Sequence, residues 1–403
     1  MKESIEIKKL GPVNHISIPE ISRFTVLIGK NGAGKSAVMK ALAMMRYIFK
    51  QENIKSYLKH SNIKKTPSTL RTNVKNVNKL GTLVSQNTEI IYKVKINSNE
   101  YSLQFKENHI RMTPSKIKKE DLAFFKVAYI SELRSMIPYM LGRLSNKSVK
   151  LDFYGDETIN DFDNATEDMD TADLGFLKLR LKVKKSPARG KIMYIEKDGK
   201  HLVNLQEASS GIKNSAPVET VVKYFASEKF SFKDAFNRSV LNYLLDSESL
   251  DCFRPVKDLI DLHKYIHVHL EEPELSLDPM SQIGLLEDLV KIIFCNDLYD
   301  RDFNMIIATH SPYIVNHLNV LMERSLQNQK SDVAAINPEY LAVYKIEDGT
   351  SESLIVNDDS IGDNRKVVDT FWFADPMSEI YDEYENLIDT LNQTSESGTD
   401  VDE

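Results

Sequence analysis

The chain has 403 residues and a formal net charge of −7 at pH 7, with 28% charged residues. This length allows a large core and more than one lobe, and the negative charge excludes a uniformly basic nucleic-acid binder while allowing a local basic face. The two cysteines form no pairing pattern and fit a reducing compartment. The first residues lack the apolar stretch of a signal peptide, and the apolar runs are too short for a membrane span. We therefore expect a soluble, cytoplasmic protein that does not bind membranes.

The N-terminal part predicts a β-hairpin followed by a strand, a glycine-rich loop and a helix. Residues 4–8 and 14–19 alternate apolar and polar side chains around a turn, which is typical of paired strands. Residues 24–28 form a continuous apolar run, as buried strands do, and the helix covers about 35–50. The loop between this strand and this helix reads Gly29-Lys30-Asn31-Gly32-Ala33-Gly34-Lys35-Ser36.

This loop has the Walker A spacing, G-x-x-x-x-G-K-[ST], and each residue type suits phosphate binding. Glycines let backbone N–H groups approach phosphate oxygens, and the following helix directs the positive end of its dipole to the same place. Lys35 is expected against the β- and γ-phosphates, and the Ser36 hydroxyl is expected to ligate Mg²⁺. The predicted nucleotide-binding residues are Gly29, Lys30, Asn31, Gly32, Ala33, Gly34, Lys35, Ser36 and Ala37.

Two stretches of opposite charge follow this helix. The first, residues 46–80, has one acidic residue and predicts an insertion of helix and loop, which is either a solvated surface arm or a contact for nucleic acid or another acidic partner. Its basic residues are Arg46, Lys50, Lys55, Lys59, Lys64, Lys65, Arg71, Lys75 and Lys79. The second, residues 152–173, is rich in Asp and Glu without Lys or Arg, which favours a solvated, partly disordered loop. Basic residues at 178–191 are candidates to pair with it.

The remaining elements alternate strands and helices. Hairpins are expected at 88–96 with 100–105 and at 191–196 with 200–205, and residues 228–262 favour an inserted helical segment. Further strands are expected at 127–130, 265–270, 305–308 and 341–346, and helices at 279–294, 312–325 and 376–392. This order predicts an α/β fold with a largely parallel core sheet.

A second chemical stretch, Glu271-Glu272-Pro273-Glu274, ends the strand at 265–270. Parallel strands deliver their last residues to the carboxyl edge of the sheet, which is the edge where the glycine loop also emerges. One acid there can hold Mg²⁺, and the next can orient or deprotonate an attacking water. We assign Glu271 to magnesium and Glu272 to the general base, and an exposed acidic turn without chemistry is the alternative.

Polar residues also follow the strand at 305–308. His310 comes directly after Thr309, and Ser311 and Pro312 can then cap and begin a helix. This location places His310 beside the expected phosphate site and favours a role in sensing the γ-phosphate. Asp278 stands before Pro279 in the same manner and predicts a helix start.

These motifs, taken in order, resemble the heads of ABC-type ATPases in the RecF, SMC and OLD-like group. The resemblance covers about 29–45 and 205–320. Its motifs are Walker A, the signature-like Ser209-Ser210-Gly211-Ile212-Lys213, the Walker B acids at 271–274, the D-loop Ser276-Leu277-Asp278 and the histidine at 310. The Ser-Ser-Gly form is similar to that of stand-alone ATPase subunits in prokaryotic antiviral defence systems such as Septu, PARIS or retron-type systems.

The resemblance implies a P-loop NTPase head with an N-terminal mixed β-sheet lobe, a parallel core sheet flanked by helices, and helical insertions. It implies ATP hydrolysis with ATP and Mg²⁺ as cofactors, and with Lys35, Glu272 and His310 as the catalytic residues. Two heads would face each other, so that Ser210, Gly211 and Asp278 line the nucleotide interface. A homodimer or a higher even-numbered homo-oligomer is therefore expected.

The chain departs from the larger members of this group. It shows no sustained heptads between the Walker motifs and no Toprim-like acidic pattern after His310. We expect an ATPase that controls a separate effector, a nuclease or a toxin, in antiphage defence, with nucleic acid as a further candidate partner. Two alternatives stay open: a RecF-like DNA-repair ATPase that binds DNA directly, and an ATP-gated assembly scaffold with negligible turnover.

The expected division of the chain follows these motifs. The segments are 1–45 with Walker A, 46–85 as a basic helical insertion, 86–135 with hairpins and a strand, 136–190 with a helix and an acidic and basic insertion, 191–227 with a hairpin and the signature helix, 228–262 as a helical insertion, 263–350 with Walker B, D-loop and histidine, and 351–403 with strands, a helix and a disordered acidic tail.

Overall fold

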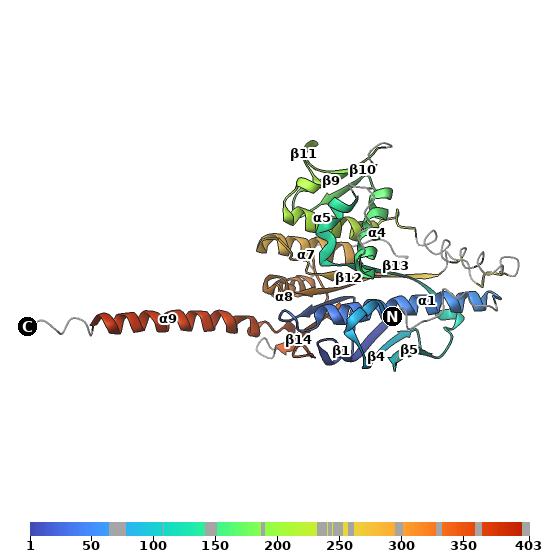
Figure 1. Cartoon of the computed structure of the whole chain (residues 1–403), viewed down its shortest axis with the longest axis horizontal. Helices are drawn as coiled ribbons and strands as arrows, with labels where there is room; N and C mark the ends of the chain where they lie inside the picture. Colours follow the sequence, from blue (N-terminus) through green and yellow to red (C-terminus); the bar gives the residue numbers. More distant parts are fainter. Residues whose placement is uncertain are drawn as a thin grey trace, which may run out of the picture.

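The computed structural model contains a mostly parallel six-stranded sheet, three antiparallel sheets and the helices between them (Figure 1). It describes the whole chain except residues 64–77, 108, 142–150, 187–189, 232–239, 241–243, 245–252, 257–261, 295–300, 328–332, 359–364 and 397–403. Most of the helical insertion expected at 228–262 therefore lies outside the described residues.

The six-stranded sheet forms the core, with the strand order β15-β14-β3-β13-β12-β7. Its strands are β3 (Phe24–Ile28), β7 (Ala123–Ile130), β12 (His263–Glu271), β13 (Arg301–Thr309), β14 (Leu341–Glu347) and β15 (Thr350–Ser353). Neighbours from β14 to β7 pair in parallel, and β15 pairs antiparallel with β14. All five residues of β3 are buried, as expected for a central strand of a sheet covered on both faces. The α/β fold with a largely parallel core sheet is confirmed.

An antiparallel sheet lies on the opposite side of helix α1 (Lys35–His60) from the core sheet (Figure 1). Its order is β2-β1-β4-β5-β6, and its strands are β1 (Lys2–Leu10), β2 (Val13–Ile18), β4 (Val84–Ile96), β5 (Asn99–Lys106) and β6 (His109–Thr113). Both hairpins that the alternating sequence predicted in this part of the chain are confirmed. Alternation places one face of these strands against α1, so α1 is enclosed between two sheets.

Helix α1 runs to His60, beyond the expected end near residue 50. Arg46 is 2% exposed and donates to the carboxylate of Glu3, and the buried Lys55 pairs with Glu52 at 2.6 Å. The interpretation of 46–80 as a solvated arm or nucleic-acid contact is therefore wrong for Arg46 and Lys55, because this part of the helix lies between the two sheets. Lys64, Lys65, Arg71 and Lys75 lie outside the described residues.

The acidic stretch 152–173 forms helix α4 (Phe153–Asp168) and strand β8 (Thr171–Leu174), so the expected disordered loop is wrong. Asp152 caps the helix, since its carboxylate accepts a hydrogen bond from the N–H of Gly155 at 2.7 Å. Tyr154 and Phe162 are buried on the inner face of the helix. The acidic residues thus share an amphipathic helix with apolar residues that hold it against the core.

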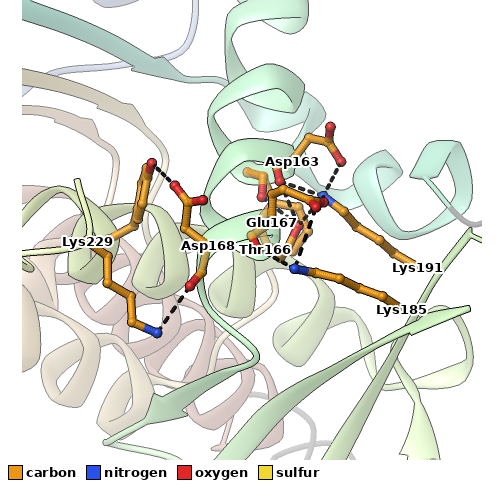
Figure 2. A network of polar contacts seen from close by, with 9 residues as sticks. Asp163, Thr166, Glu167, Asp168, Lys185, Lys191 and Lys229 are labelled. Carbon is orange, nitrogen blue, oxygen red and sulfur yellow. Dashed lines mark hydrogen bonds and ion pairs between the residues drawn. The ribbon is translucent and has the colours of Figure 1, made fainter. Parts of the chain in front are cut away.

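Lysines of the following basic stretch neutralise the outer face of α4, as Figure 2 shows. Lys191 lies 2.8 Å from Asp163 and 2.9 Å from Glu167, and Lys185 lies 3.5 Å from Glu167. The pairing expected between the acidic stretch and the basic residues at 178–191 is confirmed for these side chains. These contacts offset the charge of two acidic residues of α4, Asp163 and Glu167.

Two smaller antiparallel sheets and the remaining helices complete the fold. A four-stranded antiparallel sheet joins β8 to β9 (Leu179–Ser186), β10 (Gly190–Lys197) and β11 (Lys200–Asn204), and a two-stranded one joins β16 (Ile355–Asp358) to β17 (Arg365–Val368). The helices are α3 (Ile137–Leu141), α5 (Ser210–Phe225), α7 (Pro279–Phe294), α8 (Pro312–Leu326) and α9 (Ala374–Glu396), and a short 3₁₀ helix, η4 (Glu132–Met136), follows β7.

Helix α9 extends away from the body of the molecule (Figure 1). Its side chains Ile380, Tyr381, Tyr384 and Leu387 are exposed. Within the described residues, the molecule has no helix that combines the length and apolar character needed to cross a membrane.

Candidate functional site

The carboxyl ends of β3, β12 and β13 meet at one edge of the core sheet. Ile28 lies opposite Thr309, and Ala308 lies opposite Glu271 in the parallel register. The residues that directly follow these three strands therefore lie next to one another. This register brings Gly29, His310 and Glu272 to the same edge, as the sequence predicted from the rule for parallel strands.

The loop from Gly29 to Gly34 depends on its glycines in two different ways. Gly34 has a φ of 108° in the left-handed region, and a Cβ there would lie 2.9 Å from Cγ2 of Val13. At Gly29, a Cβ would lie 2.1 Å from the carbonyl oxygen of Ile346 in β14. Neither position can accept a side chain without moving the loop. Helix α1 begins directly after Gly34, and its first turn carries no acidic residue, so its positive end is available to an anion.

Lys35 folds back over the loop. Its Nζ donates to the carbonyl oxygens of Gly29 at 2.8 Å and Lys30 at 3.0 Å, and it lies 3.4 Å from Nδ1 of His310. Burial lowers the pKa of Lys35 to about 8, although the carboxylates of Glu272 and Glu274 act against this shift. The side chain is thus a buried cation held by carbonyl oxygens, and phosphate oxygens could replace these partners.

His310 joins the loop to the acids that follow β12. Its backbone N–H donates to Oε1 of Glu274 at 2.6 Å, and its Nε2 lies 3.8 Å from Oε1 of Glu272. Burial and the nearby Lys35 lower the pKa of His310, so the ring is neutral at pH 7. Because Lys35 can only donate, Nδ1 is the acceptor, and Nε2–H is directed to the side of Glu272.

Glu271 is buried, with 2% of its surface exposed, and within the described part of the chain neither carboxylate oxygen has a hydrogen-bond partner of good geometry. Burial and the neighbouring carboxyl of Glu132 raise its pKa to about 7, while the hydroxyl of Tyr129 acts in the opposite direction. A buried carboxyl group without a well-formed hydrogen bond fits a divalent cation, which takes oxygen ligands. Ser36, at the exposed start of α1, offers the hydroxyl expected for the same ion.

The signature-like segment and the D-loop lie against each other. Ser209 caps α5, and Ser210 and Gly211 form its first turn. A Cβ on Gly211 would lie 2.9 Å from the carbonyl oxygen of Ser276. Asp278 is exposed and caps α7 by accepting from the N–H of Met280 at 3.0 Å, which confirms the predicted helix start.

Sequence reasoning left two residues of this edge without a role. Glu274 binds the backbone of His310, as described above, and Arg134 donates to the carbonyl oxygens of Glu271 and Glu272. Both could have been suspected, because Glu274 belongs to the acidic run after β12 and Arg134 follows the end of β7. Their partners are backbone atoms, however, and these leave no pattern in a sequence.

The predicted site residues occupy two places. Lys35, Glu272 and His310 lie together with the Walker A loop and Glu271, whereas Ser210, Gly211 and Asp278 lie on the surface formed by the starts of α5 and α7. Of the remaining loop residues, Lys30, Asn31 and Gly32 are exposed, Ala33 is half-buried and Ala37 is buried.

The chain is similar to solved structures of low sequence identity. One is an SMC head domain from Thermotoga maritima, with 13% identity over 87% of this chain and 97% of that chain and a TM-score of 0.36. Another is an Smc head domain with an extended coiled coil bound to the C-terminal domain of ScpA from Pyrococcus furiosus, with 10% identity over 95% of this chain and 99% of that chain and a TM-score of 0.39. A third is the recombination mediator protein RecF-ATPrS, with 12% identity over 88% of this chain and 98% of that chain and a TM-score of 0.36. A search of the curated proteins gives no significant match. Residues 24–218 match a family model described as an AAA domain, putative AbiEii toxin, type IV toxin–antitoxin system.

Proposed function

We propose that the protein is an ATPase whose nucleotide site is completed by a second copy of the chain, and that it controls a separate effector. One observation carries the proposal of catalysis. Lys35, Glu272 and His310 come from three separate segments, and His310 lies 3.4 Å from Lys35 and 3.8 Å from Glu272. A phosphate-binding cation, a carboxylate and a neutral imidazole at one edge are the groups that phosphate hydrolysis needs.

Each of these side chains has a task that its surroundings allow. Lys35 would exchange its carbonyl partners for phosphate oxygens, which are stronger acceptors because they are charged. Glu272 would orient the attacking water and accept its proton, and His310 would contact the γ-phosphate through Nε2–H. Ser36 and Glu271 would hold Mg²⁺, which supplies positive charge to the phosphate oxygens when it is bound.

The second copy is proposed from the surface position of the signature-like segment. Ser210 is exposed at the start of α5, where a helix directs its positive end outward. Gly211 beside it carries no side chain that would keep an anion away. A nucleotide held by the Walker A loop of one copy could therefore meet Ser210, Gly211 and Asp278 of another.

Control of a nuclease or toxin in antiphage defence is the proposed role of the closed dimer. It is supported by the description of the matched family, which names a putative toxin of a type IV toxin–antitoxin system. Direct binding of nucleic acid loses part of its basis, because Arg46 and Lys55 of the basic stretch are buried.

The test replaces Glu272 by glutamine, which keeps the size of the side chain but removes its ability to accept a proton. We expect Glu272→Gln to bind ATP with unchanged affinity, to hydrolyse it at least about 10²-fold more slowly, and to accumulate ATP-bound dimers in light scattering. Glu339→Gln, a surface carboxylate far along the chain from the site, is the matched control and should leave hydrolysis unchanged. Equal hydrolysis by Glu272→Gln and the wild type would refute the assignment, and an ATP-dependent dimer without turnover in the wild type would favour the scaffold.

A further inference from the structure

Arg134 is completely buried, yet its guanidinium donates to backbone carbonyl oxygens. Nε donates to Asn214 at 3.1 Å, Nη1 donates to Ser131 at 3.1 Å and to Glu271 at 2.7 Å, and Nη2 donates to Glu272. Burial lowers its pKa to about 10, while the nearby carboxylates, Glu274 first, act against the shift. One side chain thus joins three segments: η4, helix α5 and the residues that end β12.

Such an arrangement is costly for folding alone. A buried guanidinium loses its hydration, and carbonyl dipoles compensate it less well than a directly bound carboxylate does. An apolar residue of similar volume would avoid this cost. The partners of Arg134 therefore suggest that it is needed to hold the segments that it joins, and not only for the stability of the fold.

One of these partners needs support from its surroundings. Glu272 has a φ of 44°, in the left-handed region that a non-glycine residue adopts only when its neighbours enforce it. Its N–H donates to Ala308 at 2.8 Å, and its carbonyl oxygen accepts from Arg134 and from the N–H of Leu275 at 3.1 Å. The bond from Arg134 fixes the peptide plane just after Glu272, and so helps to set the direction of the Glu272 carboxylate.

Another partner belongs to the signature helix. The Asn214 carbonyl binds Arg134, and the Asn214 side chain donates to the carbonyl of Ser210 at 3.0 Å and to Oγ of Ser276 at 3.3 Å. The start of α5 is therefore joined to the turn after Glu272 directly, through Asn214 and Ser276, and indirectly, through Arg134. A shift of α5 would move the peptide that carries Glu272.

We infer that Arg134 is the positioning residue for Glu272, and that it connects the signature helix of one head to the general base of the same head. This inference rests on the proposed ATPase function. Binding of a second copy at Ser210 and Gly211 would then change the position of Glu272 through Arg134, without any contact between Arg134 and the nucleotide.

The test is Arg134→Lys, which keeps the positive charge but loses the fork that reaches three segments. We expect kcat for ATP hydrolysis to fall about 10²-fold, because a displacement of about 1 Å at a catalytic group has this effect, while the Kd for ATP changes less than about threefold. In the Glu272→Gln background the same substitution should reduce hydrolysis no further, because the group that it positions is already absent.

Arg23→Lys is the matched control. Arg23 also donates to two carbonyl oxygens, those of Phe303 and Ile293, but it precedes β3 at the end of the core sheet opposite the site. We expect Arg23→Lys to lower the Tm without changing kcat. A wild-type kcat in Arg134→Lys, or equal effects of Arg134→Lys and Arg23→Lys on kcat, would overturn the inference.

A measurement on the wild type covers the case in which Arg134→Lys does not fold. Hydrogen exchange with and without a non-hydrolysable ATP analogue should show residues 210–216 and 271–276 gaining protection together, as one cooperative unit. Protection of one segment alone would contradict the connection. Loss of hydrolysis in Arg134→Lys together with unchanged hydrolysis in Glu272→Gln would refute the proposed base instead, so the two failures are distinguishable.

Discussion

Buried charges are handled differently in two regions of the molecule. In the core network, formed by Glu3, Arg46, Tyr92 and His269, the guanidinium of Arg46 meets both carboxylate oxygens of Glu3, at 3.0 and 2.6 Å. The Tyr92 hydroxyl donates to the same carboxylate, and Nη1 of Arg46 lies 3.1 Å from Nε2 of His269. At the edge of the core sheet, Lys35 and Arg134 instead donate to carbonyl oxygens, and the buried oxygens of Glu271 have no hydrogen bond of good geometry within the described residues.

This difference separates groups that hold the fold from groups that the proposed function assigns to ligand binding. Pairing a cation with a carboxylate satisfies both charges and leaves neither for another molecule. Lys35 is bound by carbonyls and Glu271 lacks a well-formed hydrogen bond within the described residues, so under the proposed function both would retain charge for a nucleotide and a divalent ion. The core network is therefore expected to contribute mainly to stability, and the sheet edge mainly to the proposed reaction.

Lys35→Ala should produce the largest effect, and it acts on ligand binding. The loss of the cation that faces the phosphates should weaken ATP binding at least 10³-fold, about 4 kcal/mol, in calorimetry. The free energy of unfolding should stay within about 1 kcal/mol of the wild type, because the partners of Lys35 are carbonyls of a surface loop. ATP affinity within tenfold of the wild type would show that the edge is not a nucleotide site.

Arg46→Met should have the opposite profile. Removal of one member of a buried pair leaves Glu3 as an uncompensated charge, so the free energy of unfolding in urea should fall by about 3–5 kcal/mol. ATP affinity of the protein that remains folded should not change. The double variant Glu3→Met with Arg46→Met should recover most of the loss, and failure to recover it would show that packing, not charge, is decisive.

Acid should weaken the core network through Glu3. Burial is the largest single influence and would raise the pKa of Glu3, but Arg46, His267 and Tyr92 together outweigh it and lower the pKa from 4.5 to about 2. A lowered pKa means that this stabilisation is complete above pH 4.5 and is lost as the pH falls toward 2, by about 3 kcal/mol. Urea unfolding of the wild type and of Glu3→Gln at pH 6 and pH 3 should therefore converge at the lower pH. Parallel pH profiles of the two proteins would contradict this account.

The sequence predicted the sheet edge better than it predicted the surroundings of α1. Strand 24–28 and helix 279–294 match their predicted bounds, because glycine, proline and capping residues mark their ends locally. The burial of Arg46 was missed because Glu3, which neutralises its charge, lies on β1 and no local pattern connects the two residues. Helix α4 was missed although the pairing of its acids with lysines at 178–191 was expected, because the run of Asp and Glu obscured the apolar face that Tyr154 and Phe162 bury.

Arg134 illustrates a further limit. Its position after β7 is visible in the sequence, but its four acceptors are main-chain atoms that any residue type would provide. Motifs record side chains that must have one chemistry, and they do not record which backbone atoms a side chain reaches. The roles of Ser210, Gly211 and Asp278 toward a second copy stay predictions for a related reason, because their proposed partner is another molecule.

The pairing of β3 also has a consequence for biosynthesis. β3 and the glycine loop are made within the first 36 residues, but both sheet neighbours of β3 lie beyond residue 300, and one of them supplies the Ile346 carbonyl against Gly29. A nascent chain therefore carries a complete Walker A sequence long before the strands that shape it leave the ribosome. We expect ATP binding to appear late in translation, and chaperones to encounter the apolar strand β3 until then.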